Sequence, residues 1–591
     1  MKKTFKKTEL INPTFANENR TKRQDMNSIG FNNFRRFANF PEMDLGDITL
    51  LVGGNNSGKS TLVKALLLCV DNAQLMKTST LDDILNIKSP KFRFDANDWH
   101  DVKIKTFSRA IHNRLAPSLD NLLDDELTLP TKMRFTFTLG NFKFIIEVAG
   151  DKDKDEPTGE VTFISIEDRG NMVQYSANYA YHSMSYSVLG STSERETLVQ
   201  KLYKEYASAR EELNALSEAG DDIAAISAQS EKVTSLEKQI EEFVNPDGND
   251  LPEDFDYEQA LKAQFVQSLN TRYTSTSWDL PMEDYIDVAN ENLLVHIIGN
   301  FIEFANNPGQ TKPEGIEDPN EYSTAMQTWM YVQEAREALK QEVDKMRKSK
   351  TDLRLLLNSI HFEYITAHAA NQNTIYNSAD RNDYIAETVH EFVRENILKG
   401  QDEHRFVVDW MDKFGIGSDF ETEQFGGEAY RVIIKDADGY EVNLADKGMG
   451  SIQMMILLLR IATLLRFYRP KSMVGFYPTI IIEEPEQNLH PRVQSLLADL
   501  LLYLNKEYNC KFVIETHSEY LIRKTQVLVA NEKYEDEKAL KENNPFKVYY
   551  FDADNAKMPY YQMIYRTDGK FSNEFGPGFF DTAAELAFEL F

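Results

Sequence analysis

Cysteine is nearly absent from this sequence. Only Cys69 and Cys510 occur among its 591 residues, and no C-x-x-C pattern is present. A disulfide framework, a cysteine-ligated zinc site and an iron–sulfur cluster all need more thiols at closer spacing, so we expect none of them. Few cysteines are typical of proteins in the reducing cytoplasm, and we predict that location.

Long uncharged apolar runs are also missing. The most apolar helix-like run, from Ile452 to Phe467, is interrupted by Arg460 and Arg466. A membrane-spanning helix needs about 20 predominantly apolar residues. The basic start of the chain, residues 1–27, leads into no apolar stretch and does not resemble a signal peptide. We therefore predict no membrane span.

Positive charge is in deficit. The 65 Lys and Arg residues face 94 Asp and Glu residues, which gives a formal net charge of -29 at pH 7. Nonspecific coating of nucleic acid depends on clustered positive charge, so this balance argues against it but leaves room for a local patch that contacts DNA or RNA. The hydrophobic share of 42% is that of a globular protein, and the length predicts several domains.

The chain divides into an N-terminal tail at 1–27 and three regions. Region 28–190 contains the strand-like segments FRRFANF and ITLLV and later the alternating runs MRFTFTL, FKFIIEV and VTFISI, which predict an antiparallel sheet. Region 356–591 alternates strands and helices. Its runs TIII and KFVI are short and apolar, as expected of parallel strands buried on both faces.

Region 191–355 is predicted to be mostly helical. Two arms separated by AGDD carry apolar residues at three- and four-residue steps, which predicts a short antiparallel coiled-coil hairpin. The arms contain Leu198, Leu202, Tyr206, Ala209, Leu213 and Leu216, and then Ile223, Ile226, Val233, Leu236, Ile240 and Phe243. Phe301 and Phe304 are interpreted as core. A long helix is expected around 321–356, where the cations between Lys345 and Arg354 could contact DNA or a protein partner. Acidic residues lie among them, so a solvated charged face is favoured.

The segment GGNNSGKST matches the phosphate-loop pattern G-x-x-x-x-G-K-[ST]. It follows the strand ITLLV and precedes an apolar helix, as the mechanism requires. Backbone N–H groups at the helix N-terminus favour phosphate, Lys59 reaches the outer phosphates, and Ser60 offers an oxygen to Mg²⁺. The pattern therefore predicts binding of ATP with Mg²⁺. The predicted nucleotide-binding residues of the loop are Gly53, Gly54, Asn55, Asn56, Ser57, Gly58, Lys59, Ser60 and Thr61.

Two later strands carry the other candidate catalytic groups. PTIIIEEPEQNLHP predicts a buried strand that ends in Glu483 and Glu484. The first carboxylate can hold Mg²⁺ through water, and the second can orient or deprotonate the attacking water. KFVIETHS predicts a further strand that leads to His517. A single histidine there is usually structural, but after a phosphate loop its neutral imidazole can hydrogen-bond the γ-phosphate.

In this order, with LADKGMGSIQ between the loop and the second strand, these elements resemble the ABC ATPases. The resemblance implies an α/β ABC-ATPase head, in which a P-loop parallel sheet core is accompanied by an antiparallel β-subdomain and an inserted helical lobe. It also implies a homodimer, because a signature segment at a helix N-terminus contacts the γ-phosphate bound by the other chain. The corresponding residues here are Asp446, Gly448, Gly450, Ser451 and Gln453, with Gly-Met-Gly-Ser in place of the usual L-S-G-G-Q.

Three further positions follow from the resemblance. Glu483 stands where that family has a magnesium-site Asp. No Gln-loop matches the pattern, and His100 in FDANDWHDV is a candidate substitute, with a surface histidine as an equal alternative. Arg35 and Arg36 could meet the adenine or the ribose, or form an ordinary exposed pair.

The segments IEEPEQNLHP, IETHSEYLIRK and GKFSNEFGPGFFD resemble the OLD family and related SMC-like bacterial defence ATPases, over about 28–105 and 356–591. This implies an ATPase subunit of an antiphage defence system, similar to Septu-type or retron-associated ATPases, that controls a partner nuclease or effector. Some of these relatives carry a TOPRIM nuclease domain, but Asp552 and Asp554 in YYFDADN are better explained as an exposed strand end. Two alternatives remain open: a nucleotide-gated scaffold with negligible turnover, and an ATPase of DNA repair or chromosome maintenance, although the zinc hook and long coiled coil of the tethering type are absent.

Overall fold

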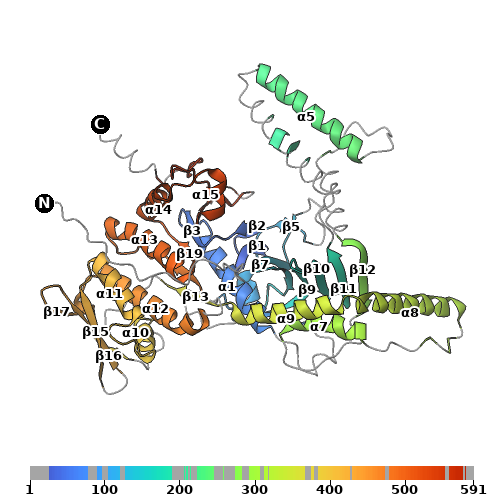
Figure 1. Ribbon diagram of the computed structural model, residues 1–591. Coiled ribbons are helices and arrows are strands. Elements are labelled where there is room, and N and C mark those ends of the chain that lie inside the picture. Colours follow the sequence, from blue (N-terminus) through green and yellow to red (C-terminus); the bar gives the residue numbers. More distant parts are fainter. Residues whose placement is uncertain are drawn as a thin grey trace.

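The computed structural model of the chain contains two large sheets, a set of helices around them and a projecting helix, α5 (Ile223–Val244) (Figure 1). The residues that it describes are 26–76, 89–95, 104–119, 127–189, 223–244, 273–281, 292–306, 318–366, 375–377, 384–425, 429–472, 478–552, 558–576 and 579–580, with isolated residues among 202–213, 257, 312–316 and 555.

A six-stranded sheet forms the centre of the fold and joins distant parts of the sequence. Its order is β13-β18-β19-β3-β20-β21. All neighbours pair in parallel except β20 with β21. The strand before the phosphate loop is β3, and the runs TIII and KFVI form β18 and β19, so their parallel pairing is confirmed. The bounds are β3 (Ile48–Gly53), β13 (Phe362–Ile365), β18 (Thr479–Glu483), β19 (Lys511–Glu515), β20 (Phe546–Phe551) and β21 (Tyr560–Met563).

Side chains of this sheet alternate between two hydrophobic cores. Leu51, Ile481 and Val513 join the core that contains helix α1 (Lys59–Leu75). Leu50 and Ile482 join the core on the opposite face. Because apolar residues cover both faces, the sheet is buried and its strand ends are held in place. The helices of the second core are α10 (Tyr384–Arg394), α11 (Asp402–Phe414), α12 (Met449–Ser472), α13 (Pro491–Tyr508), α14 (Glu519–Glu532) and α15 (Glu537–Asn543).

A nine-stranded antiparallel sheet packs next to α1. Eight of its strands follow the order β12-β11-β10-β9-β8-β7-β1-β2, and β4 (Lys91–Arg93) pairs with β9. The predicted runs MRFTFTL, FKFIIEV and VTFISI lie in β7, β8 and β9, as expected. The bounds of the strands are β1 (Met26–Phe34), β2 (Phe37–Asp44), β7 (Lys132–Leu139), β8 (Phe142–Ala149), β9 (Thr158–Asp168), β10 (Val173–Asn178), β11 (Ser183–Leu189) and β12 (Tyr273–Pro281).

The segment FRRFANF is not one strand, which corrects the prediction. It contains the turn between β1 and β2, and Arg35 has φ 52 in that turn. Its aromatic residues Phe34, Phe37 and Phe40 are buried on both sides of the turn. The turn is tied to α3 (Phe107–Ala110), because the Arg35 N–H donates to the Ala110 carbonyl at 2.6 Å.

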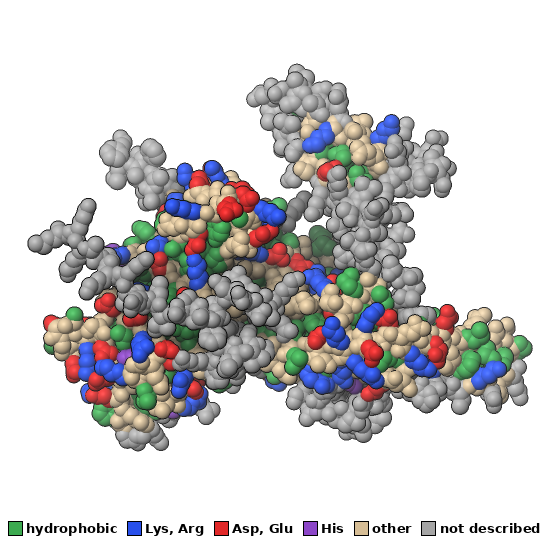
Figure 2. Space-filling model, viewed as in Figure 1, with side chains coloured by type: hydrophobic (Ala, Val, Ile, Leu, Met, Phe, Trp, Pro, Cys, Tyr) green, Lys and Arg blue, Asp and Glu red, His purple; other side chains and the backbone are tan. Residues whose placement is uncertain are grey.

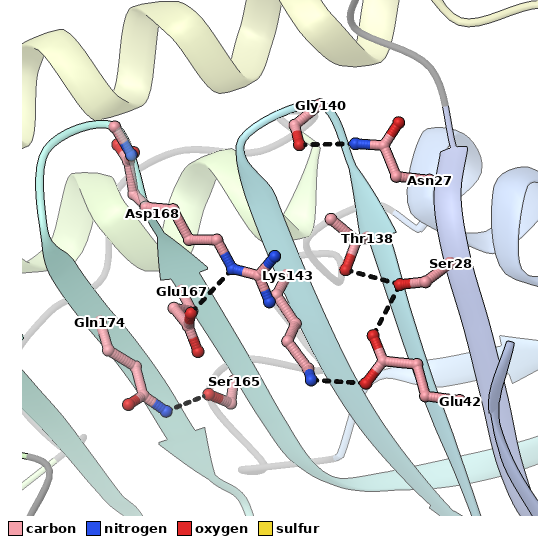
Figure 3. A network of polar contacts seen from close by, with 12 residues as sticks. Asn27, Ser28, Glu42, Thr138, Gly140, Lys143, Ser165, Glu167, Asp168 and Gln174 are labelled. Carbon is pink, nitrogen blue, oxygen red and sulfur yellow. Dashed lines mark hydrogen bonds and ion pairs between the residues drawn. The ribbon is translucent and has the colours of Figure 1, made fainter. Parts of the chain in front are cut away.

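One face of the antiparallel sheet carries polar side chains that bond across strands (Figure 3). The Ser28 hydroxyl donates to a Glu42 carboxylate oxygen at 2.6 Å and lies 2.9 Å from the Thr138 hydroxyl. The Lys143 ammonium donates to the other Glu42 oxygen at 2.6 Å. The opposite face is apolar and buried, so the sheet covers the α1 side of the core with one face only.

In the region at 191–355 the structure describes the helix of the second predicted hairpin arm, isolated residues of the first arm, and one strand that was not predicted. Six of the predicted hairpin residues form one small core, Leu202, Tyr206, Ala209, Val233, Leu236 and Ile240. The second arm is α5 (Ile223–Val244), and the Tyr206 hydroxyl donates to Glu237 of that arm at 3.0 Å. Strand β12 extends the antiparallel sheet, whereas the other elements described in this region are helices. In helix α7 (Leu293–Asn306), Phe301 and Phe304 are fully buried, as predicted.

The single long helix expected around 321–356 is two helices, α8 (Pro319–Lys340) and α9 (Val343–Ser359). The junction contains neither proline nor glycine, so no residue signals the break. Around it, Lys345 pairs with Glu342 at 2.7 Å and Arg347 with Asp344 at 3.4 Å. Figure 2 shows cations and acids interspersed along these helices, which supports a solvated charged face. Contact with DNA or RNA remains a prediction.

Among the described residues, Met449–Tyr468 of α12 is the one helix whose length and composition would allow it to cross a membrane, and 72% of its most apolar stretch is buried inside the protein. It packs against α10 and α11 as a core helix. A small sheet lies beyond these helices (Figure 1). Its strands are β14 (Tyr376–Asn377), β15 (Asp419–Phe425), β16 (Ala429–Lys435) and β17 (Glu441–Asn443). The remaining short elements are β5 (Ala116–Pro117), β6 (Leu127–Thr128) and the 3-10 turn Leu444–Asp446.

Candidate functional site

The loop between β3 and α1 requires glycine at two positions. Gly53 has φ +141, and an added Cβ would lie 2.5 Å from the Phe551 carbonyl oxygen. Gly58 has φ +109, and its Cβ would lie 2.2 Å from the Phe37 ring. Other residue types rarely adopt these angles, and neither position has room for a side chain. Helix α1 then begins at Lys59 with no side-chain cap and no acid in its first turn, so its N-terminal N–H groups remain suited to an anion.

The Lys59 side chain is 3% exposed and lies within this loop. Its ammonium donates to the Gly53 and Gly54 carbonyls, each at 3.0 Å. Burial lowers the pKa of Lys59, while the carboxylate of Glu515 at 3.9 Å acts in the opposite direction. The Ser57 hydroxyl is also buried, and no described residue pairs with its oxygen. A buried cation beside an unpaired hydroxyl fits a polar anionic ligand.

A cavity of about 620 Å³ opens at this loop. Arg35, Arg36 and Arg109 line it, and contact of Arg35 and Arg36 with the adenine or the ribose remains a prediction. Burial lowers the pKa of Arg35, and the neighbouring charge of Arg109 lowers it further. Like charges are gathered here at an electrostatic cost that an anion would offset. Arg109 was not predicted as a site residue. It belongs to α3, which is brought to the loop only by the turn between β1 and β2. The full lining is Arg35, Arg36, Asn56, Ser57, Gly58, Lys59, Ser60, Thr61, Lys64, Ser108, Arg109, Ile111, Asn113 and Glu515.

Two strands of the central sheet end in carboxylates on the α1 face. Glu483 ends β18, Glu515 ends β19, and the two residues are register partners. The Ser60 hydroxyl donates to Glu515, with distances of 3.0 and 2.9 Å to its two oxygens. Burial and the nearby charge of Glu483 raise the pKa of Glu515 to about 7, although Lys59 and Ser60 oppose the shift. Glu515 was not predicted. The motif KFVIETHS contains it, two residues before the histidine, and the acid at the strand end was the signal that could have identified it.

Glu484 and His517 lie together at the same edge of the sheet. Glu484 has φ 42, and its N–H donates to the Glu515 carbonyl at 2.7 Å. One Glu484 oxygen lies 3.5 Å from the His517 Nε2, and Gln487 donates to the other oxygen. Burial lowers the pKa of His517, and the positive charge of Lys59 lowers this pKa further. The imidazole is therefore neutral near pH 7.

The loop after β18 also holds the histidine backbone. Glu486 is 8% exposed, and it accepts a hydrogen bond from the His517 N–H at 2.6 Å. Burial raises the pKa of Glu486. The sequence therefore uses its E-E-P-E-Q run in two ways: Glu484 faces the imidazole, and Glu486 fixes the segment that carries it.

The signature-like residues lie at the start of α12. The Ser451 N–H donates to the Gly448 carbonyl at 2.8 Å in the first turn. A Cβ on Gly450 would lie 2.6 Å from the Asn488 carbonyl oxygen, so this glycine packs on the loop after β18. Gln453 is buried and donates to the Pro485 carbonyl at 3.3 Å. Gln453 thus contacts its own chain, and Gly448, Gly450 and Ser451 remain candidates for contact with a second chain.

Some predicted positions cannot be placed. His100 and Asp554 lie outside the described residues. Asp552 follows β20, which pairs in parallel with β3, and its N–H donates to the Pro559 carbonyl at 3.0 Å. Asp552 thus lies directly after a strand of the central sheet.

Taken together, the described residues fit a nucleoside triphosphate and a divalent cation. The loop and the arginines suit phosphate groups, because backbone N–H groups and guanidinium groups donate hydrogen bonds to anions. Ser60, Glu483 and Glu515 offer the oxygen ligands that Mg²⁺ prefers. Glu484 and His517 supply a carboxylate and a neutral imidazole beside them, which can act on a water and on a phosphate oxygen.

The family to which the chain is similar agrees with this chemistry. A family model described as AAA ATPase domain matches residues 26–522. No curated protein matches the chain. A solved structure of the Smc head domain with an extended coiled coil, bound to the C-terminal domain of ScpA and derived from Pyrococcus furiosus, aligns at 9% identity and a TM-score of 0.31, covering 96% of this chain and 99% of that chain. The Smc head domain with a coiled coil and joint from Pyrococcus yayanosii aligns at 11% identity and a TM-score of 0.30, covering 92% and 98%. Superpositions this weak carry no argument about function.

Proposed function

Because this chain belongs to the AAA ATPase domain family, which its match over residues 26–522 shows, we propose that it hydrolyses ATP at the β3–α1 loop and works as a homodimer. The observation that supports this most directly is the meeting of three segments at one sheet edge. Lys59, Glu484 and His517 come from distant parts of the sequence, yet Glu484 lies 3.5 Å from His517, and the charges of both Lys59 and Glu484 act on the His517 pKa.

The chain's own groups have distinct tasks in this proposal. Lys59 and the N-terminus of α1 bind the phosphates and offset their charge. Glu484 accepts the proton of the attacking water, and His517 donates a hydrogen bond to a phosphate oxygen. Arg35, Arg36 and Arg109 hold the rest of the nucleotide. When bound, Mg²⁺ would neutralise charge on the triphosphate, held by Ser60 and the strand-end carboxylates.

The dimer is supported by what the cavity lacks. Among the described residues that line it, none belongs to the segment from Gly448 to Gln453. If that segment takes part in catalysis, as the resemblance implies, it acts on the nucleotide of another chain. Mixing two inactive variants tests this arrangement. Lys59→Ala disables the loop and Ser451→Arg disables the helix start, so only a mixed dimer contains one intact site. We expect the mixture to regain at most about one quarter of the parental turnover, since half of randomly mixed dimers contain one good site of two. No regain at any mixing ratio would argue against shared sites.

We further propose that ATP turnover controls a partner nuclease or other effector in antiphage defence. This rests on the resemblance of the IEEPEQNLHP and IETHSEYLIRK segments to bacterial defence ATPases. Only the ATPase chemistry is carried by the site itself. The test is a phage plaque assay in cells that carry this gene with its neighbouring genes. We expect protection that is lost with Lys59→Ala, and equal plaque counts with and without the genes would refute the defence role while leaving the ATPase role intact.

Turnover measured beside affinity separates an ATPase from a nucleotide-gated scaffold. An ATPase releases phosphate repeatedly at saturating MgATP, at the typical rate for enzymes of about 1 to 1000 per second or somewhat below it. A scaffold binds with the same affinity and releases less than one phosphate per chain. Phosphate release by the parent and by Glu484→Gln, with bound ATP quantified in both, distinguishes the two.

A further inference from the structure

Glu515, the carboxylate beside the phosphate loop, has a position that neither Glu483 nor Glu484 shares. Glu515 is 6% exposed, ends β19 and lines the cavity at the loop. Strand β19 is the direct neighbour of β3, whereas β18, which carries Glu483, is one strand further away. Adjacent strands are about 4.8 Å apart, so the backbone of Glu515 lies closer to the backbone of β3 than that of Glu483 does, by about one strand spacing.

The contact between Ser60 and Glu515 is the central observation. The Ser60 hydroxyl lies 3.0 and 2.9 Å from the two oxygens of Glu515. Among the described residues that line the cavity, Glu515 is the only carboxylate, and Glu483 is not among them. The hydroxyl that a phosphate loop offers to a cation is therefore in direct contact with Glu515 and not with Glu483.

The surrounding groups show that this is more than an acidic cluster. Lys59 lies 3.9 Å from Glu515, and the buried Ser57 hydroxyl of the same loop has no described partner. Glu484, Glu515 and His517 can each place one ligand atom within 4.8 Å of the others. Two carboxylates and one imidazole therefore converge beside the phosphate site, and the carboxylate oxygens are the ligands that a hard divalent cation prefers.

Resting on the proposed ATPase function, we propose that Glu515 is a ligand of the divalent cation that accompanies ATP, directly or through one water, and that it partners Ser60 in this task. Glu483, its register partner on β18, then contributes less to holding the cation than Glu515 does. The resemblance to the ABC ATPases predicted that Glu483 holds the cation. In this chain the nearer carboxylate comes from the neighbouring strand.

Cation binding, measured apart from turnover, tests the assignment. The full chain is mixed with the non-hydrolysable analogue AMP-PNP, and Mn²⁺ binding is followed by electron paramagnetic resonance. AMP-PNP affinity is measured in parallel with Mn²⁺ and with EDTA. The variants are Glu515→Gln and Glu483→Gln, and Glu507→Gln serves as a charge-matched control on the exposed end of α13.

We expect Glu515→Gln to weaken Mn²⁺ binding by about 10- to 100-fold or more, the range seen when groups around a bound metal are removed. In EDTA its affinity for AMP-PNP should equal or exceed that of the parent, because one negative charge has left the phosphate site. Glu483→Gln should weaken Mn²⁺ less than Glu515→Gln does, and the control should match the parent. If Glu515→Gln fails to fold, as judged by its thermal unfolding, Glu515→Asp replaces it, and we expect an intermediate loss of Mn²⁺ affinity.

The outcomes separate this assignment from the function on which it rests. A parent chain that binds no AMP-PNP with or without metal refutes the nucleotide site, and this inference with it. A parent that binds AMP-PNP with Mn²⁺, together with Glu515 variants that bind Mn²⁺ as the parent does, overturns only the role of Glu515. If the loss appears in Glu483→Gln alone, the cation belongs to β18 and the contact between Ser60 and Glu515 exists only in the nucleotide-free chain.

Discussion

Replacing Glu484 by glutamine tests the assignment of the general base. The change exchanges one carboxylate oxygen for an amide NH₂ and keeps the shape of the side chain. The amide oxygen can still accept the hydrogen bond from Gln487, so the loop after β18 should keep its conformation. What is lost is the proton acceptor that lies 3.5 Å from the His517 Nε2.

General base catalysis contributes about 10²- to 10⁴-fold to the rate of a reaction, which corresponds to about 2.7 to 5.4 kcal/mol of activation free energy. We therefore expect Glu484→Gln to bind ATP with parental affinity, to accumulate as an ATP-bound dimer, and to lose two to four orders of magnitude in turnover. Phosphate release at saturating MgATP measures the rate, and light scattering after gel filtration measures the dimer. Glu507→Gln is the control for a lost surface charge. A Glu484→Gln chain that releases phosphate at the parental rate would show that another group takes the proton.

Three other substitutions test separate parts of the structure. Lys59→Ala removes a buried ammonium from the loop, and we expect nucleotide binding to fall below detection at millimolar ATP in isothermal titration. Gly53→Ala forces a Cβ to within 2.5 Å of a backbone oxygen at φ +141, so the free energy of unfolding should fall by more than about 2 kcal/mol in urea titrations. Gly54→Ala is the control: nothing lies within 4 Å of its Cβ, and its free energy of unfolding should be nearly unchanged. Arg460→Ala removes the partner of Glu363, whose pKa burial already raises, and should destabilise the chain by about 3 kcal/mol at pH 8. This deficit should shrink as the pH falls, because protonation removes the buried charge of Glu363, and a deficit that grows in acid would contradict the argument.

The phosphate loop shows how far local sequence can predict a site. Its residues are contiguous, and their chemistry depends on one strand, one turn and one helix that follow each other in the chain. The glycines at 53 and 58 and the lysine at 59 were therefore assigned from the pattern alone, and the structure places Gly58 and Lys59 at the cavity, with Gly53 at the end of β3. The parallel strands β18 and β19 were predictable for a similar reason, because continuous β-branched runs fit only a sheet that is covered on both faces.

The errors share a different cause. FRRFANF contains a tight turn that neither glycine nor proline marks, and the break between α8 and α9 has no glycine or proline either. In both cases the backbone changes direction because the flanking residues pack against other elements, and local preferences do not report such packing. Strand β12 likewise pairs with β11 across most of the hairpin region, so its partner lies far away in the sequence.

By itself, the sequence determined the chemistry of this protein: a loop that binds phosphate, strand ends that carry carboxylates, and an imidazole that follows a buried strand. The order of strands in the central sheet was decided only by the tertiary structure. That order places β19 between β3 and β18, and so brings Glu515 to Ser60 and leaves Glu483 one strand away. The turn between β1 and β2 likewise brings Arg109 to the loop. Strand order and the docking of a turn depend on contacts between residues hundreds of positions apart, and one-dimensional periodicity contains no information about such contacts.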